Sequence, residues 1–470
     1  MAKAVKKAKP IIPKKTPIPE CDPRARREHF DEVSLGYTPA QAMQEAERCL
    51  QCERPRCVTG CPVEVPIPRF IQALRDGDVT RALHVIKEAN LLPAVCGRVC
   101  PQESQCERVC TLAKKFEPVA IGRLERFAAD REAEAGVPPT PVIASPTGRT
   151  VAIVGSGPSG LTCAYDLARL GHKVVIYEAL HEPGGVLVYG IPEFRLPKRI
   201  VAREIETLKR MGVEIITNAV VGKLFTIEEL MERHDACFPG TGAGLPKFMG
   251  IEGENLNGVY SANEFLTRVN LMRSYRFPAY DTPVTRGSRV VVVGGGNVAM
   301  DAARTALRLG ADEVSLVYRR SLVELPARKE EVQHAEEEGI RFELCTSPVR
   351  IMGTDGRVSA LECVRMDLCE LDASGRRSPQ PIEGSAFRIG ADIVIMSVGT
   401  GANPLISRSM KKLSVNRKKY IVTDKKTGST SVEGVYAGGD IVTGAATVIS
   451  AMGTGRTAAR AMHLYLAAKK

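Results

Sequence analysis

The sequence predicts an α/β protein in which a helical N-terminal region precedes two α/β units, the second inserted in the first. Three observations predict this fold: two cysteine-rich loops before residue 111, two copies of a strand–glycine turn–helix–strand pattern, and a later return to glycine-rich strand ends. A chain of 470 residues has room for about three domains of ordinary size.

Composition narrows the classes of partner and compartment. The N-terminus, MAKAVKKAKP, is rich in lysine and proline, which predicts a basic flexible tail over residues 1–20 and no secretory signal. No run approaches the roughly 18 apolar residues that cross a bilayer. The net charge is +11, but aromatic residues are only 5% and do not alternate with basic ones. We therefore expect a cytoplasmic protein that binds neither nucleic acid nor a membrane, with cysteines used for metal or redox chemistry.

The two cysteine loops contain eight of the chain's 14 cysteines. The first reads CLQCERPRCVTGCP from Cys49, and the second reads CGRVCPQESQCERVC from Cys96. The first resembles the ferredoxin spacing, in which three close thiolates hold one cluster and a fourth reaches another. Structural zinc is the alternative, but zinc knuckles usually pair CxxC with CxxC, and the second loop has no CxxC. The loops therefore predict two iron–sulfur clusters.

The segment between the two cysteine loops, IPRFIQALRDGDVTRALHVIKEAN, has helical apolar spacing. Its apolar positions include Phe70, Leu74, Leu83 and Ile86. We therefore expect short helices to hold the two ligand loops together in a helical domain over residues 21–145.

The first α/β unit begins with RTVAIVGSGPSGLTCAYDLARLGHKVVIYE. The spacing of Gly155, Gly157 and Gly160 lets the backbone approach a pyrophosphate at a helix N-terminus. Glu178 ends the second strand, where it can accept a hydrogen bond from a ribose hydroxyl. A glycine pair that includes Gly185 follows. Because an acid in this place favours a 2′-hydroxyl, the unit predicts an FAD site.

The second unit repeats the pattern in SRVVVVGGGNVAMDAARTALRLGADEVSLVYRR. Gly294, Gly296 and Asn297 lie in its turn, and its second strand ends in Arg319 and Arg320 in place of an acid. A guanidinium pairs with the 2′-phosphate that an acid would repel, so this unit predicts an NADPH site. The alternative is that the two arginines are only an exposed charged pair.

The chain then returns to the flavin unit. GVYAGGDIVTGAATVISAMGTGR contains the pair Gly439-Asp440 and a helix that begins near Thr447 and Val448. An aspartate in this setting bonds the ribityl chain, while the helix N-terminus faces the flavin ring. We therefore expect FAD-binding segments over residues 146–285 and 399–470, with an NADPH-binding domain over residues 286–398 between them.

These motifs resemble, over almost the whole chain, the small NADPH-oxidising subunit of glutamate synthase. They equally resemble the large subunit of NADH-dependent reduced ferredoxin:NADP oxidoreductase and the N-terminal part of dihydropyrimidine dehydrogenase. The resemblance rests on the cysteine loops and on VGSGPSGL, PGGVLVYGIPEFRLPK, VVVGGGNVAMDAAR and AGGDIVTGAATVISAMGTGR. It implies one [4Fe–4S] cluster on Cys49, Cys52, Cys57 and Cys110, and another on Cys61, Cys100, Cys106 and Glu125. Cys21 and Cys96 receive no role.

The resemblance also implies the activity. It describes an NADPH oxidoreductase that passes electrons through FAD and two [4Fe–4S] clusters to a large catalytic subunit, as in glutamate biosynthesis. The alternatives are the large subunit of an electron-bifurcating, ferredoxin-linked enzyme and a flavin-carrying docking subunit with little turnover; a homo-oligomer is compatible with each. The hydride chemistry belongs to the cofactors, so no catalytic side chain is assigned. Arg195 and Lys198 are expected either to line the gap between flavin and nicotinamide or to stabilise their loop.

Overall fold

The computed structural model describes residues 12–136 and 140–469. They belong to two compact units, and the following paragraphs treat each unit by itself. The first unit contains the chain up to Glu20 and the segment that starts at Ser34, and the second contains Cys21–Val33 and the chain from Thr140 onward. Residues 21–33, predicted to belong to the cluster domain, therefore pack with the second unit.

The first unit is helical. Phe70, Leu74, Leu83 and Ile86 are all buried, as the apolar spacing predicted. The helices are α2 (Pro39–Glu47), α3 (Arg56–Thr59), α4 (Ile67–Arg75), α5 (Val79–Lys87), α6 (Pro93–Val99) and α7 (Ile121–Glu134), with 3₁₀ turns η1 (Gln102–Ser104) and η2 (Thr111–Lys114).

The flexible basic tail predicted over residues 1–20 does not extend to residue 20 in the described part of the chain. Residues 1–11 lie outside the described part of the chain. From residue 12 onward the segment packs within the first unit, where the Thr16 N–H donates to Glu45 Oε2 at 2.7 Å and Tyr37 donates to the Thr16 carbonyl at 2.6 Å. These contacts satisfy backbone groups that a solvated tail would leave to water.

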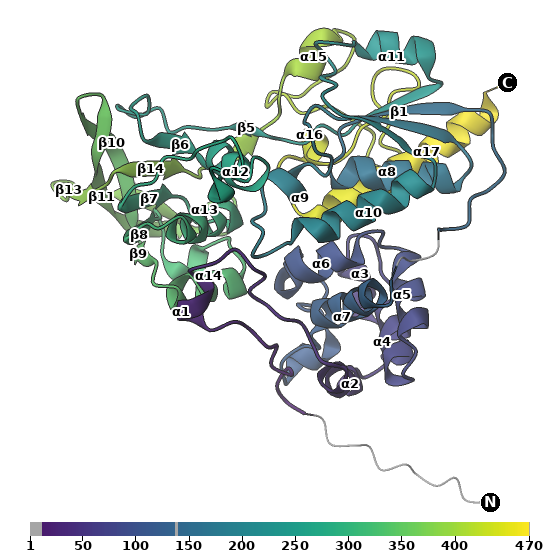
Figure 1. Cartoon of the computed structure of the whole chain (residues 1–470), viewed down its shortest axis with the longest axis horizontal. Helices are drawn as coiled ribbons and strands as arrows, with labels where there is room; N and C mark the ends of the chain where they lie inside the picture. Colours follow the sequence, from purple (N-terminus) through teal and green to yellow (C-terminus); the bar gives the residue numbers. More distant parts are fainter. Residues whose placement is uncertain (1–11, 137–139, 470) are drawn as a thin grey trace, which may run out of the picture. The chain divides into compact units, whose positions relative to one another are not determined.

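The flavin-type part of the second unit is built on a parallel sheet of strand order β3-β2-β1-β4. Helices α8, α10 and α17 lie together on one side of it (Figure 1). The long C-terminal helix α17 packs closely on α8. The two helices approach so closely that a Cβ at Gly455 would lie 2.3 Å from the Ser159 carbonyl oxygen. The bounds are β1 (Thr150–Val154), β2 (Lys173–Tyr177), β3 (Glu214–Ile216), β4 (Ala236–Pro239), α8 (Pro158–Arg169), α10 (Lys198–Arg210) and α17 (Val448–Ala468).

The inserted part contains a second parallel sheet, of order β6-β14-β7-β8-β9. An antiparallel sheet in which β11 pairs with β10, β12 and β13 completes this part. The bounds are β6 (Val259–Ser261), β7 (Arg289–Val293), β8 (Glu313–Val317), β9 (Arg341–Glu343), β10 (Thr346–Thr354), β11 (Arg357–Leu371), β12 (Arg377–Pro381), β13 (Phe387–Gly390), β14 (Ile393–Met396), α12 (Ala262–Asn270), α13 (Asn297–Arg308) and α14 (Lys329–Glu337).

The inserted part begins earlier than the expected residue 286. Strand β6 pairs with β14 at the edge of the second sheet, and α12 buries Phe265 and Leu266 in the core of that sheet. The two crossings between the parts lie side by side, since β5 (Leu245–Pro246) pairs antiparallel with β15 (Thr400–Gly401). The predicted α/β fold with an inserted nucleotide-binding unit is otherwise confirmed.

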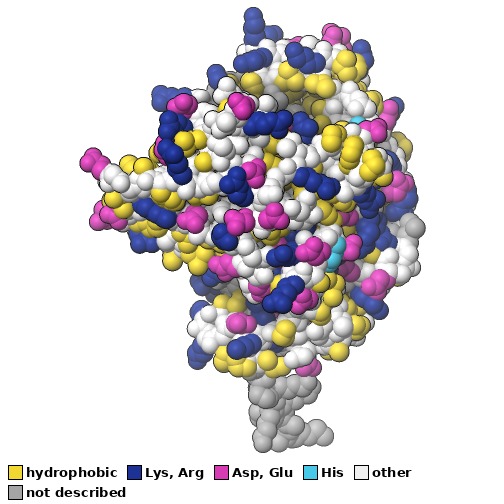
Figure 2. Space-filling view, turned by 60° about the vertical axis from the view of Figure 1, so that its left-hand side comes forward, with side chains coloured by type: hydrophobic (Ala, Val, Ile, Leu, Met, Phe, Trp, Pro, Cys, Tyr) yellow, Lys and Arg dark blue, Asp and Glu magenta, His cyan; other side chains and the backbone are white. Residues whose placement is uncertain are grey.

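The remaining elements are short. They are α1 (Pro23–Arg26), α9 (Val186–Tyr189), α11 (Ile227–Arg233), α15 (Leu405–Ser409), α16 (Asp440–Thr443), η3 (Ser274–Arg276) and η4 (Leu322–Glu324). Basic and acidic side chains are interspersed on the face shown in Figure 2. Within residues 12–136 and 140–469, no helix is both long enough and apolar enough to cross a bilayer.

Candidate functional site

The first predicted group of thiols is brought together in the helical unit. Cys49, Cys52 and Cys57 come from the loop around α3, and Cys110 comes from the second loop, just before η2. All four line one cavity. Burial, together with the neighbouring Cys110, Cys49 and Cys52, raises the pKa of the Cys57 thiol to about 12. The structure thus places the crossing donor, Cys110, beside the other three.

The second predicted group also converges. Burial, together with the nearby Glu125 and Cys100, raises the pKa of Cys61 to about 11. Burial likewise raises the pKa of Cys106, with contributions from Cys61, Glu125 and Cys100. Since each of these groups acts electrostatically on its neighbours, the four predicted donors lie near one another.

Glu125 is the unusual member of the second group. It lies on α7, is 8% exposed, and accepts a hydrogen bond from Asn90 Nδ2 at 2.7 Å. Among the described residues no ion pair to Glu125 is found, whereas buried carboxylates are normally paired or coordinate a metal. Three thiols and a carboxylate form a donor set that fits an iron-containing cluster.

Of the two cysteines without an assigned role, Cys96 lies beside the second donor set, where a hydrogen bond with Cys100 and burial raise the pKa of its thiol, whereas Cys21 belongs to the second unit. Cys96 is buried, and its thiol donates a weak hydrogen bond to Asn90 Oδ1 at 3.6 Å. Cys21 is half-buried, and its thiol donates to the Glu32 carbonyl at 3.7 Å. Both contacts are ordinary for cysteine side chains that fill space.

The first glycine turn is shaped as the motif requires. Gly155 has φ +97°, and a Cβ at Gly160 would lie 2.0 Å from the Gly155 carbonyl oxygen, so neither position accepts a side chain. Gly157 is the N-cap of α8 and no side chain caps that helix end. A Cβ at Gly157 would meet no atom within 4 Å. The turn therefore leaves open space and unsatisfied N–H groups where a pyrophosphate is expected.

Acidic and phenolic groups surround this turn. Glu178 accepts hydrogen bonds from the Ser156 N–H at 2.8 Å and the Leu180 N–H at 2.9 Å, so its carboxylate is held beside the turn. Burial raises the pKa of Tyr189 to about 12, with contributions from Asp440 and Glu178. Burial also raises the pKa of Asp440 to about 6. The predicted flavin residues from both ends of the unit thus meet, and Tyr189 joins them although no motif indicated it.

The other predicted flavin residues lie at the same place. A Cβ at Gly185 would lie 2.8 Å from the Gly157 Cα, and the Gly439 N–H donates to Thr454 Oγ1 at 2.7 Å. Thr447 caps α17, which begins at Val448, by accepting from the Ser450 N–H at 3.3 Å. The beginning of α8 has no side-chain cap, whereas Thr447 caps the beginning of α17.

The second glycine turn has the same design. A Cβ at Gly294 would lie 2.3 Å from the Ser397 carbonyl oxygen, whereas one at Gly296 would meet no atom within 4 Å. Gly296 is the N-cap of α13, and no side chain caps that helix end. Asn297 Oδ1 accepts from the Arg328 N–H at 2.8 Å, which attaches the segment after η4 to the turn. This turn also leaves room for a pyrophosphate.

The two predicted coenzyme arginines differ in their surroundings. Arg320 is buried, donates from Nε to the Arg377 carbonyl at 2.6 Å and forms an ion pair with Asp372 at 2.5 Å. Arg319 is exposed, and the structure records no ion pair for it among the described residues. Arg320 thus holds the β11–β12 hairpin, and Arg319 is the guanidinium available to a 2′-phosphate.

We expect Arg319→Ala to weaken NADPH binding by about 10- to 150-fold, because a charge-assisted contact contributes about 1.5–3 kcal/mol. NADH binding should be unchanged, since NADH lacks the 2′-phosphate. Titration of each variant with both coenzymes measures this. Arg320→Ala is expected to lower the thermal unfolding midpoint in addition to any effect on NADPH binding. An equal loss of NADPH and NADH affinity in Arg319→Ala would contradict the assignment of Arg319 to the 2′-phosphate.

Arg195 and Lys198 hold the loop that joins α9 to α10. Arg195 forms ion pairs with Asp301 at 2.7 Å and with Glu331 at 2.8 Å. Lys198 Nζ donates to the carbonyls of Leu187 at 3.2 Å and of Leu196 at 2.9 Å, and burial lowers its pKa to about 7. These contacts favour the loop-stabilising interpretation. Asp301 lies in α13 without a sequence signal that would have singled it out.

Known proteins match both units. Residues 26–137 match the family model described as dihydropyrimidine dehydrogenase domain II, 4Fe-4S cluster, and residues 149–455 match the pyridine nucleotide-disulphide oxidoreductase model. The glutamate synthase [NADPH] small chain of Escherichia coli (strain K12) is 37% identical over 96% of this chain and 95% of that protein. The NADP(+)-dependent formate dehydrogenase subunit beta of Moorella thermoacetica is 41% identical over 87% of this chain, which spans 60% of that protein's length.

A solved structure supports the fold. Mycobacterium tuberculosis FprA in complex with NADPH matches with a TM-score of 0.55 and 23% identity, over 67% of this chain and 85% of that chain. The family model over residues 26–137 shows that the chain carries an N-terminal 4Fe-4S cluster domain. Because the second family model covers more than half of the chain and the Escherichia coli relative is matched over nearly its whole length, the chain belongs to the glutamate synthase small-chain family of pyridine nucleotide-disulphide oxidoreductases.

Proposed function

We propose that this chain oxidises NADPH and passes the electrons through FAD and two [4Fe–4S] clusters to a partner subunit that forms glutamate. One observation supports this most directly: a single chain assembles two separate four-donor groups and two open glycine turns, each from the predicted residues. When bound, NADPH supplies a hydride, FAD takes up two electrons together and releases them one at a time, and the clusters carry one electron at a time.

The chain's own residues bind and orient these groups. The backbone at Gly157 and Gly296 receives the two pyrophosphates, because both positions are open and begin uncapped helices. Asp440 and Thr447 lie beside the flavin turn and orient its sugar and ring ends. Arg319 selects the phosphorylated coenzyme. The eight donors fix the clusters in the helical unit, with Glu125 as the oxygen ligand.

The glutamate-forming step belongs to the partner. The parallel sheets have four and five strands, so the described part of the chain contains no (β/α)₈ barrel of the kind that commonly carries a second flavin. The Escherichia coli relative is likewise named a small chain. A second candidate is supported by the 41% identity to a formate dehydrogenase subunit beta: the same residues would then exchange electrons between NADP and a different partner.

The purified chain is expected to oxidise NADPH with an artificial one-electron acceptor but to make no glutamate from glutamine and 2-oxoglutarate. Absorbance of the coenzyme and analysis of the amino acids measure both results. A chain that does not reduce the acceptor would contradict the oxidoreductase proposal. Sustained glutamate formation by the chain alone would show that the partner is not needed.

A further inference from the structure

Residues 21–33, which we name the strap, belong to the second unit, although the residues on both sides of them belong to the first. The chain leaves the first unit after Glu20 and rejoins it at Ser34. The Cys21 N–H donates to the Val33 carbonyl at 2.9 Å, which closes the strap as a loop. The cluster unit is thus covalently continuous with both ends of a segment that packs entirely within the nucleotide-binding unit.

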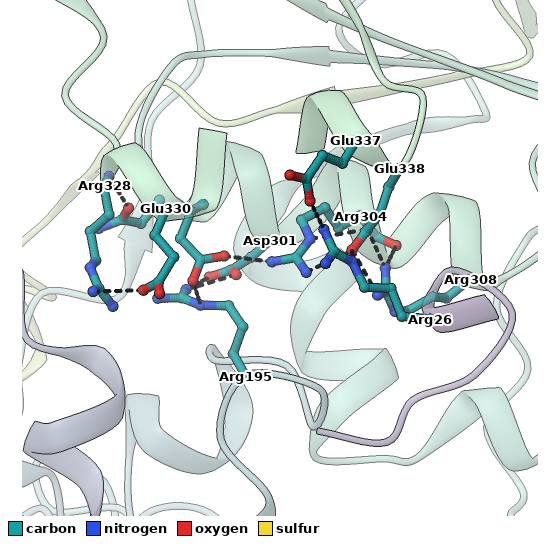
Figure 3. Close-up of polar contacts among 11 residues, drawn as sticks. Arg26, Arg195, Asp301, Arg304, Arg308, Arg328, Glu330, Glu337 and Glu338 are labelled. Atoms are coloured by element: carbon teal, nitrogen blue, oxygen red, sulfur yellow. Dashed lines mark hydrogen bonds and ion pairs between the residues drawn. The ribbon is translucent and has the colours of Figure 1, made fainter. Parts of the chain in front are cut away.

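Arg26 anchors the strap. It ends α1, whose N-terminus is capped by the Asp22 side chain, and it is 1% exposed. Its Nε donates to Glu338 Oε1 at 2.9 Å and its Nη2 donates to Glu337 Oε2 at 2.6 Å, as Figure 3 shows. Both acids lie at the C-terminal end of α14, so the strap holds that end of the helix.

Glu338 connects the strap to α13. Arg304 Nη2 donates to it at 2.8 Å and Arg308 Nη1 donates to it at 2.7 Å, both from α13. Although burial alone would raise the pKa of Glu338, these guanidiniums hold it well below its usual range. Glu338 is therefore a buried anion shared by three arginines, including Arg26.

The same network continues to the flavin part of the unit. Arg304 Nη1 donates to Glu331 at 2.5 Å, and Glu331 pairs with Arg195 in the loop between α9 and α10. Asp301 also pairs with Arg195, as Figure 3 shows. Arg26 is thereby linked to Arg195 through α14 and α13. The network joins three segments that are far apart in the sequence.

A second set of contacts runs in parallel. The Phe30 ring of the strap stacks on Tyr275 with centroids 4.3 Å apart, and the Val33 N–H donates to the Phe194 carbonyl at 3.0 Å. Arg308 lies 3.9 Å above the Phe194 ring and donates to the His29 carbonyl at 3.0 Å. The strap thus contacts both α13 and the loop that carries Arg195.

The network has equal numbers of positive and negative side chains, and this balance favours a single arrangement of their ion pairs. It contains four arginines, Arg26, Arg195, Arg304 and Arg308, and four acids, Asp301, Glu331, Glu337 and Glu338. Their side chains are at most 7% exposed, except that of Glu337, which is 33% exposed. Removing one partner of a buried pair leaves an uncompensated charge, so partial rearrangements of the network are costly.

We propose that the strap is a staple across the two nucleotide-binding parts and that Arg26 is a positioning residue for hydride transfer. Helix α13 begins at the NADPH-type glycine turn, and the Arg195 loop follows the Gly184-Gly185 pair of the flavin part. A strap that fixes α13 against this loop fixes one turn relative to the other. The inference rests on the proposed NADPH oxidation, because the distance between the reacting atoms is what the staple would set.

The test compares Arg26→Ala with Arg27→Ala in the full chain carrying its cofactors. Arg27 is 47% exposed and pairs only with the neighbouring, exposed Glu28 among the described residues, so its loss removes the same charge without touching the network. In Arg26→Ala the rate constant of flavin reduction on mixing with NADPH should fall by about 10- to 100-fold, since misplacements of about 1 Å have effects of that size. The NADPH dissociation constant, from titration, should change less than about threefold, because no coenzyme contact is removed.

A second readout does not depend on turnover. Backbone hydrogen exchange should increase in residues 190–197 and in α14 of Arg26→Ala and remain as in the wild type in Arg27→Ala. Either a wild-type reduction rate or wild-type exchange in Arg26→Ala would overturn the proposal. If that variant does not fold, Glu337→Gln removes only the outer pair, and it should give a smaller rate loss of about 3- to 10-fold with the same exchange pattern.

The outcomes separate this inference from the proposed function. Wild-type rate and exchange in Glu337→Gln, when Arg26→Ala does not fold, would overturn the staple. If the wild-type chain is not reduced by NADPH, the proposed function fails, while the exchange contrast between Arg26→Ala and Arg27→Ala still decides whether the strap fixes the two parts. If the wild type is reduced and Arg26→Ala is equally fast, only the staple fails.

Discussion

Replacing Cys57 by alanine should remove one iron–sulfur cluster, so that the iron bound per chain falls from about eight to about four. Cys57 is one of four thiols that line a single cavity, and the other three leave one corner of a cubane without a protein ligand. Buried thiols that lie close together ionise only where a cation offsets their charges. With one corner of the cluster unligated, the remaining three cysteines should therefore hold metal weakly. Iron and labile-sulfide analysis, with EPR of the reduced protein, measures the loss.

Cys163→Ala is the matched control for Cys57→Ala. Cys163 is a buried thiol in α8, where its Sγ lies 3.9 Å from Met462 Sδ and belongs to neither donor group. Its removal should leave iron and sulfide unchanged. Two zinc ions and no labile sulfide in the wild-type chain would contradict the cluster assignment, and so would an unchanged iron content in Cys57→Ala.

Gly157→Ala should weaken FAD binding by about 5- to 150-fold, from the roughly 1–3 kcal/mol that an added methyl group costs in a filled space. The apoprotein should keep its thermal unfolding midpoint. Gly157 has φ −68° and ψ 178°, which alanine adopts freely, and a Cβ there would meet no protein atom within 4 Å. The added methyl group would therefore occupy space that only the dinucleotide needs. FAD titration of the apoprotein and thermal unfolding measure the two effects separately.

Gly160→Ala provides the contrast within the same turn. Its Cβ would lie 2.0 Å from the Gly155 carbonyl oxygen, so the substitution should lower the unfolding midpoint even without FAD. Unchanged FAD affinity in Gly157→Ala would contradict the placement of the pyrophosphate. An equal loss of stability in both variants would show that Gly157 serves the fold itself.

The sequence by itself determined the features that depend on local spacing. The cysteine loops, the two glycine turns and the apolar face with Phe70 and Leu83 each lie within a short segment, where backbone geometry and periodicity decide the structure. The resemblance to a known family added the crossing donors Cys110 and Glu125. Their convergence could not follow from spacing alone, because each donor comes from a distant segment.

Only the tertiary structure decided which long-range partner each side chain finds. The inserted part begins earlier than expected because β6 pairs with β14, more than 130 residues later in the chain. Arg320 differs from Arg319 because the β11–β12 hairpin places Asp372 beside it. The strap packs with the second unit, where Glu338 is a buried charge partner of Arg26. Burial, pairing and charge compensation between distant segments are properties of the folded chain, and no local pattern encodes them.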